Sequence, residues 1–200
     1  MKTSAIVFLC LFLGLRIALD PFIWAKLHPY LAYSFEVLLI LAALWAFRTL
    51  RPWRAGFSKQ DLGLGLILLV GGALIHAGAV GLEIGVPYDL TDPQTLVFLL
   101  LLAPAIEEFL FRFVLWESLT LVKCSKLLQL QLSTLAFSLS HFVAVFSLPE
   151  AIAPFVYYQS IYVVALALLI GLRRQQGGSI WSAVFLHFTF NFGFYLGVYL

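Results

Sequence analysis

The sequence predicts an all-α, polytopic membrane protein: a helical bundle of about seven transmembrane helices with a polar cavity inside the membrane. Of its 200 residues, 62% are hydrophobic and 11% are charged, against ~45–50% and ~25% in globular proteins. Apolar runs of bilayer length recur along the whole chain and are separated by short polar links. Ionisable and amide side chains interrupt some of these runs, and such groups need a cavity or a partner at that depth.

The apolar runs and their breakers give the expected order of the spans. The runs cover about 4–19, 30–50, 62–82, 95–116, 130–148, 154–172 and 180–200. We expect three N-terminal membrane helices over 1–94 and a four-span core over 95–200, all in one integral membrane domain. The third run holds six glycines, which predict close helix–helix contact. Residues 117–131 are more polar and are typical of an interfacial helix.

Charges in the links predict the orientation of the chain. Basic residues fill alternate links, at Lys2, 48–59, Lys123, Lys126, Arg173 and Arg174, and acidic residues fill the others, at Glu83, Asp89, Asp92 and Glu150. Lys26 is the exception. The positive-inside bias therefore places the N-terminus in the cytoplasm and the C-terminus outside. The start of the chain resembles a signal peptide, but no small-residue cleavage site follows it, so we expect the first span to be retained.

The sequence indicates neither a nucleic-acid partner nor a disulfide bond. The net charge is only +2, and no basic patch is dense enough to indicate a nucleic-acid partner. The two cysteines, Cys10 and Cys124, lie far apart without metal-ligand spacing. We expect no disulfide between them.

The fourth run contains two adjacent carboxylates and a guanidinium, Glu107, Glu108 and Arg112. Glu108 and Arg112 are four residues apart, so they share a helix face and can form an ion pair. Glu107 is rotated by ~100° from Glu108 on an α-helix and must face something else. The bland interpretation is a buried structural ion pair with a spare carboxylate. The alternative is a polar reaction centre in the membrane.

Polar side chains in two later runs fall at a similar depth. Counting from the cytoplasmic end of each helix at ~1.5 Å per residue, Glu107, His141 and Asn191 lie about 14–16 Å in, and His187 about 10 Å in. His187 and Asn191 are four residues apart and share a face. Convergence of four such groups at one level predicts a functional site rather than isolated core residues. We also expect Trp116 and Tyr157, from their aromatic position alone, to line the cavity.

This set of side chains has two interpretations that the spacing does not separate. A carboxylate and an imidazole can hold and deprotonate water, while a second imidazole and an amide stabilise an oxyanion. Alternatively, Glu107, His141 and His187 can ligate Zn²⁺ with one open position. A serine mechanism through Ser138 or Ser140 is disfavoured, because no serine-hydrolase motif accompanies them.

Three patterns together resemble one known family. Glu107-Glu108-x-x-x-Arg112, Phe137-x-x-x-His141 and His187-x-x-x-Asn191 occur in this order on three predicted membrane helices. They resemble the motifs of the CAAX-processing and bacteriocin-processing (CPBP) intramembrane endopeptidases, which include the CAAX prenyl protease. The resemblance covers about residues 95–200.

The resemblance implies a role for each matching residue. Glu107 and His141 would activate water, and His187 and Asn191 would form the oxyanion hole. Glu108, Arg112 and Phe137 would support the site, with Glu108 also counted among the catalytic residues. The family is usually described as glutamate-type, so we expect no metal cofactor, with Zn²⁺ as the alternative.

The resemblance also implies partners and a location. We expect membrane lipid and a peptide or protein substrate, lipidated or belonging to a bacterial surface-sorting system. The compact chain resembles the bacterial branch, which places it in the bacterial inner membrane. Two other functions remain open: a non-catalytic scaffold or bacteriocin-immunity protein on the same fold, and a proton- or ion-coupled transporter using the same acid and imidazole groups.

Overall fold

The computed structural model describes residues 2–18, 31–47, 57–146 and 148–200. Within these ranges the chain is helical and contains no strand, which confirms the all-α prediction. The long helices are α1 (Lys2–Ala18), α3 (Leu31–Ala46), α4 (Lys59–Gly81), α8 (Lys126–Phe142), α9 (Ala153–Gln175) and α10 (Ile180–Leu196). Most of the link predicted before α3, with Lys26, and most of the basic link before α4 lie outside the described residues.

A central helical run stands where the fourth span was predicted. It consists of α5 (Pro93–Val97), a π-helical segment η1 (Phe98–Leu102), α6 (Ala103–Glu108), a second π-helical segment η2 (Phe109–Leu115) and α7 (Trp116–Leu121). The run is therefore not the uniform α-helix that the sequence predicted. Pro104 supplies one cause, because its ring cannot donate a backbone hydrogen bond and crowds the carbonyl four residues earlier, inside η1.

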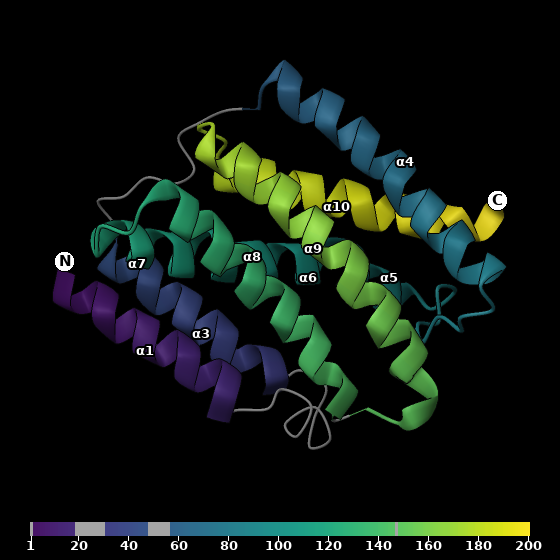
Figure 1. Ribbon diagram of the computed structural model, residues 1–200, viewed down its shortest axis with the longest axis horizontal. Coiled ribbons are helices and arrows are strands. Elements are labelled where there is room, and N and C mark those ends of the chain that lie inside the picture. The colour runs from purple at the N-terminus through teal and green to yellow at the C-terminus, as the bar shows by residue number, and fades with distance from the viewer. Residues whose placement is uncertain (1, 19–30, 48–56, 147) are drawn as a thin grey trace.

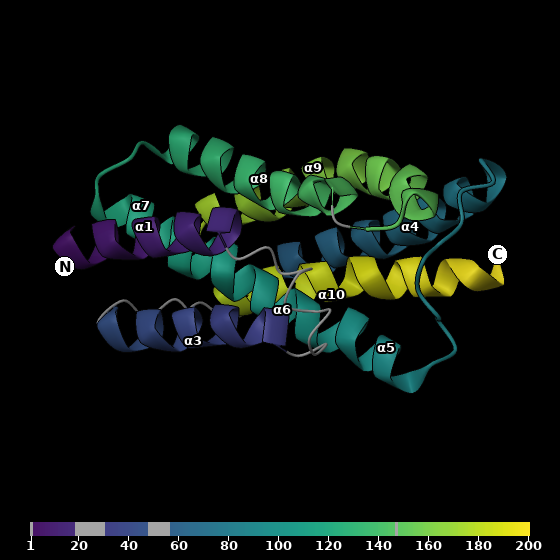
Figure 2. The same cartoon turned by 90° about the horizontal axis from the view of Figure 1, so that it is seen from below.

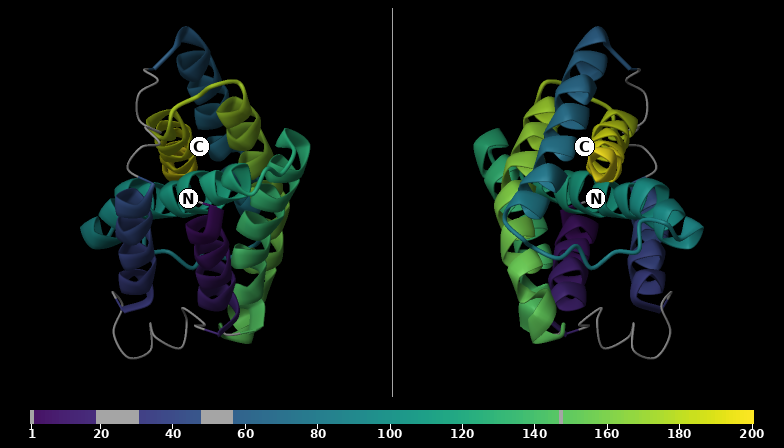
Figure 3. Two further views of the ribbon diagram at one scale, coloured as in Figure 1. Left: turned by 90° about the vertical axis from the view of Figure 1, so that its left-hand side faces the viewer. Right: turned by 90° about the vertical axis from the view of Figure 1, so that its right-hand side faces the viewer.

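The other helices pack on two sides of this central run. The two end-on views show α4, α9 and α10 on one side and α1 and α3 on the other (Figure 3). α4 packs along α10, and α8 packs along α9, as the ribbon views show (Figures 1 and 2). Short 3₁₀ segments η3 (Val143–Phe146), η4 (Glu150–Ile152) and η5 (Gly197–Tyr199) complete the described chain.

Close packing of α4 on α10 explains part of the glycine content of the third run. A side chain at Gly72 would meet the backbone oxygen of Phe190 at 2.1 Å, and one at Gly193 would meet the oxygen of Leu69 at 1.9 Å. Gly63, Gly71 and Gly81 have nothing within 4 Å. The predicted close contact is thus made by some of these glycines, on one face of α4.

Side-chain caps set the helix ends. Ser58 caps α4 in a reciprocal capping box with Asp61, and Arg173 of α9 binds the Asp61 carboxylate with its Nε at 2.6 Å. Ser125 caps α8, so this helix begins four residues before the predicted start of the fifth span. The predicted interfacial helix over 117–131 is interrupted between α7 and α8, where Lys123 has a φ of 66°.

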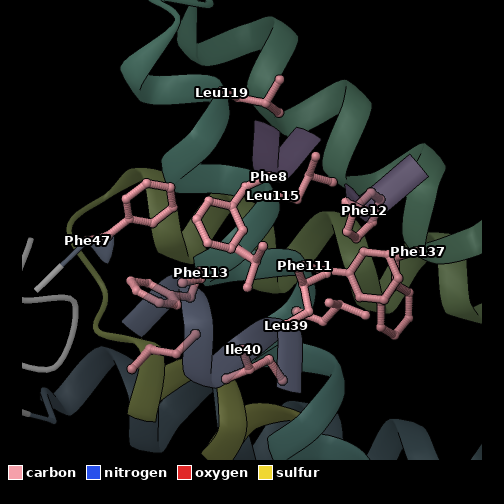
Figure 4. Packing of buried hydrophobic residues seen from close by; sticks show 14 of the residues in the cluster. Phe8, Phe12, Leu39, Ile40, Phe47, Phe111, Phe113, Leu115, Leu119 and Phe137 are labelled. Atoms are coloured by element: carbon pink, nitrogen blue, oxygen red, sulfur yellow. The ribbon is translucent and has the colours of Figure 1, made fainter. Parts of the chain in front are cut away.

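An aromatic core joins α1 and α3 to the back of the central run. Phe8 and Phe12 of α1 and Phe47, just after α3, pack with Phe111 and Phe113 of η2, with further aliphatic residues around them (Figure 4). The Phe12 and Phe111 rings meet edge-on, with their centroids 5.5 Å apart. Burial of these rings anchors η2 against α1 and α3. The orientation of η2 in turn sets which face of the preceding α6 points toward α8 and α10.

Two helical segments of the described chain are long and apolar enough to cross a membrane by length and composition. They are Lys59–Gly81 and Glu150–Gln175. α3 contributes a shorter apolar helix, Tyr33–Ala46. The predicted helical bundle is confirmed. The two helices that pass this test do not establish the seven predicted spans.

Candidate active site

A cavity of about 390 Å³ lies between α3, the central run, α8, α9 and α10. Glu107 of α6, His141 of α8, and His187 and Asn191 of α10 all line it. The structure therefore brings together the four groups whose depths matched in the sequence. The remaining described lining is largely apolar and aromatic.

Glu107 stands between the two imidazoles. Its carboxylate is partly exposed, and its Oε2 lies 3.9 Å from Nε2 of His141 and 3.9 Å from Nε2 of His187. These separations are too long for direct hydrogen bonds but fit atoms that share an intervening small molecule. Glu107 is thus the common neighbour of both histidines.

A backbone carbonyl orients His141. Its Nδ1 lies 3.0 Å from the carbonyl oxygen of Phe137, one turn earlier on α8. A carbonyl can only accept, so Nδ1 carries the proton in this bond. In the neutral ring, Nε2 then presents a lone pair toward Glu107. The Phe137 ring is fully buried and packs on the His141 ring, with centroids 4.7 Å apart, which limits rotation of the imidazole.

A buried carboxylate orients His187. Oε1 of Glu108 lies 2.9 Å from Nδ1 of His187, and Glu108 is fully buried. The predicted pair with Arg112 is also present but longer, with 3.6 Å between Nε of Arg112 and Oε2 of Glu108. Glu108 therefore contacts two charged or polar side chains, and its shorter contact is with the imidazole. This arrangement resembles the carboxylate–histidine pairs that fix ring orientation in other enzymes.

Arg112 ties the central run to two neighbouring helices. It is fully buried, and its terminal nitrogens donate to Oγ of Ser133 on α8 and to the carbonyl oxygen of Ala167 on α9, each at 3.0 Å. Its guanidinium carbon also lies 5.3 Å from the centre of the Phe137 ring. Arg112 and Phe137 thus pack behind the site without lining the cavity, and their supporting role stays a prediction.

The Asn191 side chain donates one amide hydrogen to a backbone carbonyl, and its second amide hydrogen takes no part in that bond. Its Nδ2 donates to the carbonyl oxygen of Leu99 at 2.8 Å. Leu99 belongs to the π-helical segment η1, where the α-helical bonding pattern is altered. The bond fixes the side chain at the cavity wall, and the amide retains a second N–H donor.

Several cavity residues were missed by the sequence patterns. Tyr33 and Glu36 of α3 line the cavity, as do Tyr88 in the link before α5, and Gln159 and Tyr162 of α9. A Glu in an apolar run was the available signal for Glu36, but no spacing connected it to the later motifs. The expectation that Trp116 and Tyr157 line this cavity was wrong: Trp116 is buried in the packing, and Tyr157 is 53% exposed on the outer surface.

Glu107, His141 and His187 were the side chains predicted to bind Zn²⁺ in the alternative interpretation, and their positions can now be examined. Both imidazoles present Nε2 toward one carboxylate oxygen, with Nδ1 held by a second group, as in many metal sites. As positioned, however, no three His, Cys, Asp or Glu side chains of the described residues form a group that could hold a metal ion. Binding Zn²⁺ would require Glu107, His141 and His187 to move closer together. The geometry therefore fits bridging water without rearrangement.

Comparison with known proteins gives one family. A family model described as type II CAAX prenyl endopeptidase, Rce1-like, matches residues 90–193, just over half of the chain. No curated protein and no solved structure gave a match. The matched region includes the central run, α8, α9 and most of α10.

Proposed function

Because the chain belongs to the type II CAAX prenyl endopeptidase Rce1-like family, we propose that it is an intramembrane endopeptidase that uses Glu107 and His141 to activate water. The family implies a membrane-associated peptide or protein substrate. The observation that carries the proposal is the convergence of Glu107, His141, His187 and Asn191 on one cavity.

The first step is attack of water on the scissile carbonyl. Oε2 of Glu107 and Nε2 of His141 are 3.9 Å apart, close to the spacing of two acceptors that share one water through hydrogen bonds of ~2.8 Å. Glu107 takes a proton as the water attacks, and returns it to the leaving amine. His141 accepts the second hydrogen bond and aims the water's lone pair at the carbonyl carbon.

The second requirement is stabilisation of the oxyanion that forms on the carbonyl oxygen. The uncommitted N–H of Asn191 is one donor. His187 is the other: it donates from Nε2 when the ring carries both protons, while Glu108 holds Nδ1 at 2.9 Å. No step in this scheme calls for a metal ion.

We propose that the chain crosses the membrane seven times with its N-terminus in the cytoplasm. Large apolar side chains on the outer surface support this seating, among them Leu66, Ile67, Trp45 and Ile161, each more than 60% exposed. α1 begins at the same end of the long axis as the link between α7 and α8 (Figures 1 and 2). The acidic link before α5 lies at the opposite end, with the end of α10. The membrane that we propose is the bacterial inner membrane.

The substrate that we propose is a lipidated protein or peptide, or a component of a bacterial sorting system. An aromatic and aliphatic cavity beside the polar centre suits an apolar chain or apolar side chains next to the scissile bond.

Glu107→Gln tests the proposal, because it removes the base and keeps the shape. The purified protein in detergent would be given a farnesylated peptide ending in a CAAX sequence, with release of the terminal tripeptide as the readout. We expect a rate loss of about 10²–10⁴-fold. Glu150→Gln, an exposed position in η4, is the matched control and should keep full activity. Turnover near that of the wild type in Glu107→Gln would remove Glu107 from the mechanism.

A further inference from the structure

A second polar group lies in the cavity wall and has no part in the proposed chemistry. It consists of Tyr88 in the link before α5, and Gln159 and Tyr162 of α9. Each of these three side chains carries a hydrogen-bonding group into the lining of one cavity. Glu107 lines the same cavity. These three side chains, the Gln159 group, therefore share a cavity with the carboxylate proposed as the base.

The group is held in place by aromatic packing. Tyr162 lies against Phe190 and Phe194 of α10, with ring centroids 5.6 and 6.4 Å apart. Tyr88 packs edge-on against Phe155, with centroids 5.6 Å apart. Gln159 and Tyr162 are three residues apart on α9 and share its cavity face. The polar ends of the group are thus presented by rings that have little freedom to move.

The group matches the hydrogen-bonding needs of a peptide backbone. A Gln amide offers two donors and an acceptor, and a phenol offers a donor and an acceptor. A tyrosine hydroxyl is protonated at neutral pH and is therefore able to donate. A peptide that enters an apolar cavity must find partners for its N–H and C=O groups, because each one left without a partner costs free energy.

The charges around the cavity disfavour an anionic occupant at this position. The described residues that line it include Glu36 and Glu107 and no Lys or Arg. A free C-terminal carboxylate next to Glu107 would meet a like charge. A neutral amide group would meet no such penalty.

We propose that Tyr88, Gln159 and Tyr162 form a substrate-binding subsite that holds the uncharged peptide backbone next to the scissile bond. This inference rests on the proposed function, since it assigns a subsite to the same cavity. It predicts that the subsite contributes to binding of substrate and transition state alike. Its loss should therefore raise KM and leave kcat nearly unchanged.

Gln159→Leu tests the subsite, because it keeps the bulk of the side chain and removes its polar atoms. The matched control is Ser160→Ala on the next position of α9, whose hydroxyl bonds to the carbonyl of Val156. With a farnesylated CAAX peptide, we expect KM to rise about 3- to 10-fold in Gln159→Leu, as for the loss of one or two hydrogen bonds. Tyr162→Phe and Tyr88→Phe should each give a smaller rise, and the control none.

A second form of the peptide separates the backbone from the terminal carboxylate. If the subsite holds backbone, the KM increase is the same for the free acid and for the C-terminal amide. An increase seen only with the free acid would overturn the proposal in favour of carboxylate binding. An unchanged KM in Gln159→Leu would also overturn the proposal, whether kcat is unchanged or falls 100-fold.

A binding measurement keeps this test separate from the activity. The dissociation constant of the same peptide for Glu107→Gln, alone and combined with Gln159→Leu, requires no cleavage. A dissociation constant that is 3- to 10-fold larger in the double variant supports the subsite, even if the wild type cleaves nothing. Absence of cleavage would count against the proposed function alone. Equal constants would refute the subsite even if cleavage is observed.

Discussion

Gly72→Ala is expected to damage the candidate site from a position that does not line the cavity. A methyl group at Gly72 would lie 2.1 Å from the backbone oxygen of Phe190 and 2.7 Å from the backbone nitrogen of Phe194. Both atoms belong to the backbone of α10, so no side-chain rotation relieves the contact. α4 and α10 must instead move apart.

The size of the movement follows from these contacts. Restoring an ordinary separation between the new methyl and the Phe190 oxygen needs a displacement of about 1.3 Å. α10 carries His187 and Asn191, whose positions relative to Glu107 define the site. A misplacement of ~1 Å in a catalytic group can cost on the order of 10²-fold in rate. Overpacking of this kind also costs about 1–3 kcal/mol of stability.

Gly71→Ala is the matched control, because nothing lies within 4 Å of a side chain at Gly71. Alanine there should leave stability unchanged or raise it by up to ~1 kcal/mol, the helix-propensity gain over glycine. The measurements are the thermal unfolding midpoint in detergent and the cleavage rate per folded molecule. We expect a midpoint lower by about 2–10 °C in Gly72→Ala alone. Equal midpoints and equal rates in the two variants would refute the close approach of α4 and α10.

Two further predictions concern the polar centre. Asn191→Ala should lower kcat by about 10²–10³-fold and leave peptide binding largely intact. A chelator should have no effect on the wild type. Stoichiometric zinc that tracks with activity in elemental analysis would contradict this metal-free scheme. Glu108→Ala should lower the yield of folded protein more than Glu108→Leu combined with Arg112→Met, because the single change leaves a buried guanidinium without its carboxylate, at ~3–5 kcal/mol. Equal yields, read by size-exclusion chromatography, would show that Glu108 and Arg112 are not coupled.

The convergence of the site was predictable because membrane depth constrains it. Glu107, His141 and Asn191 come from three helices, yet a bilayer fixes where each apolar run begins and so aligns their depths. The helix period alone also placed His187 and Asn191 on one face. These inferences used only local spacing and the cost of polar groups in an apolar environment.

The partners of individual side chains were less predictable, because they depend on packing between helices. Spacing along one helix favoured Arg112 as the partner of Glu108, whereas the shorter contact comes from His187 on α10, 79 residues away in sequence. The π-helical segments were also missed, since hydrophobic periodicity over a short run does not separate 3.6 residues per turn from a locally wider helix. Gln159 escaped notice because a single amide in an apolar run has no spacing signal.

The two adjacent glutamates act on opposite nitrogens of one imidazole. Glu108 contacts Nδ1 of His187 from the buried side, and Glu107 faces Nε2 from the cavity. Neighbouring positions on a helix point in directions ~100° apart, so one carboxylate can be sealed in the packing while the next reaches the cavity. The burial differs accordingly: the Glu108 side chain is 0% exposed and the Glu107 side chain 22%. The pair is therefore not redundant: Glu107 faces the cavity, whereas Glu108 is sealed in the packing and contacts Nδ1 of His187.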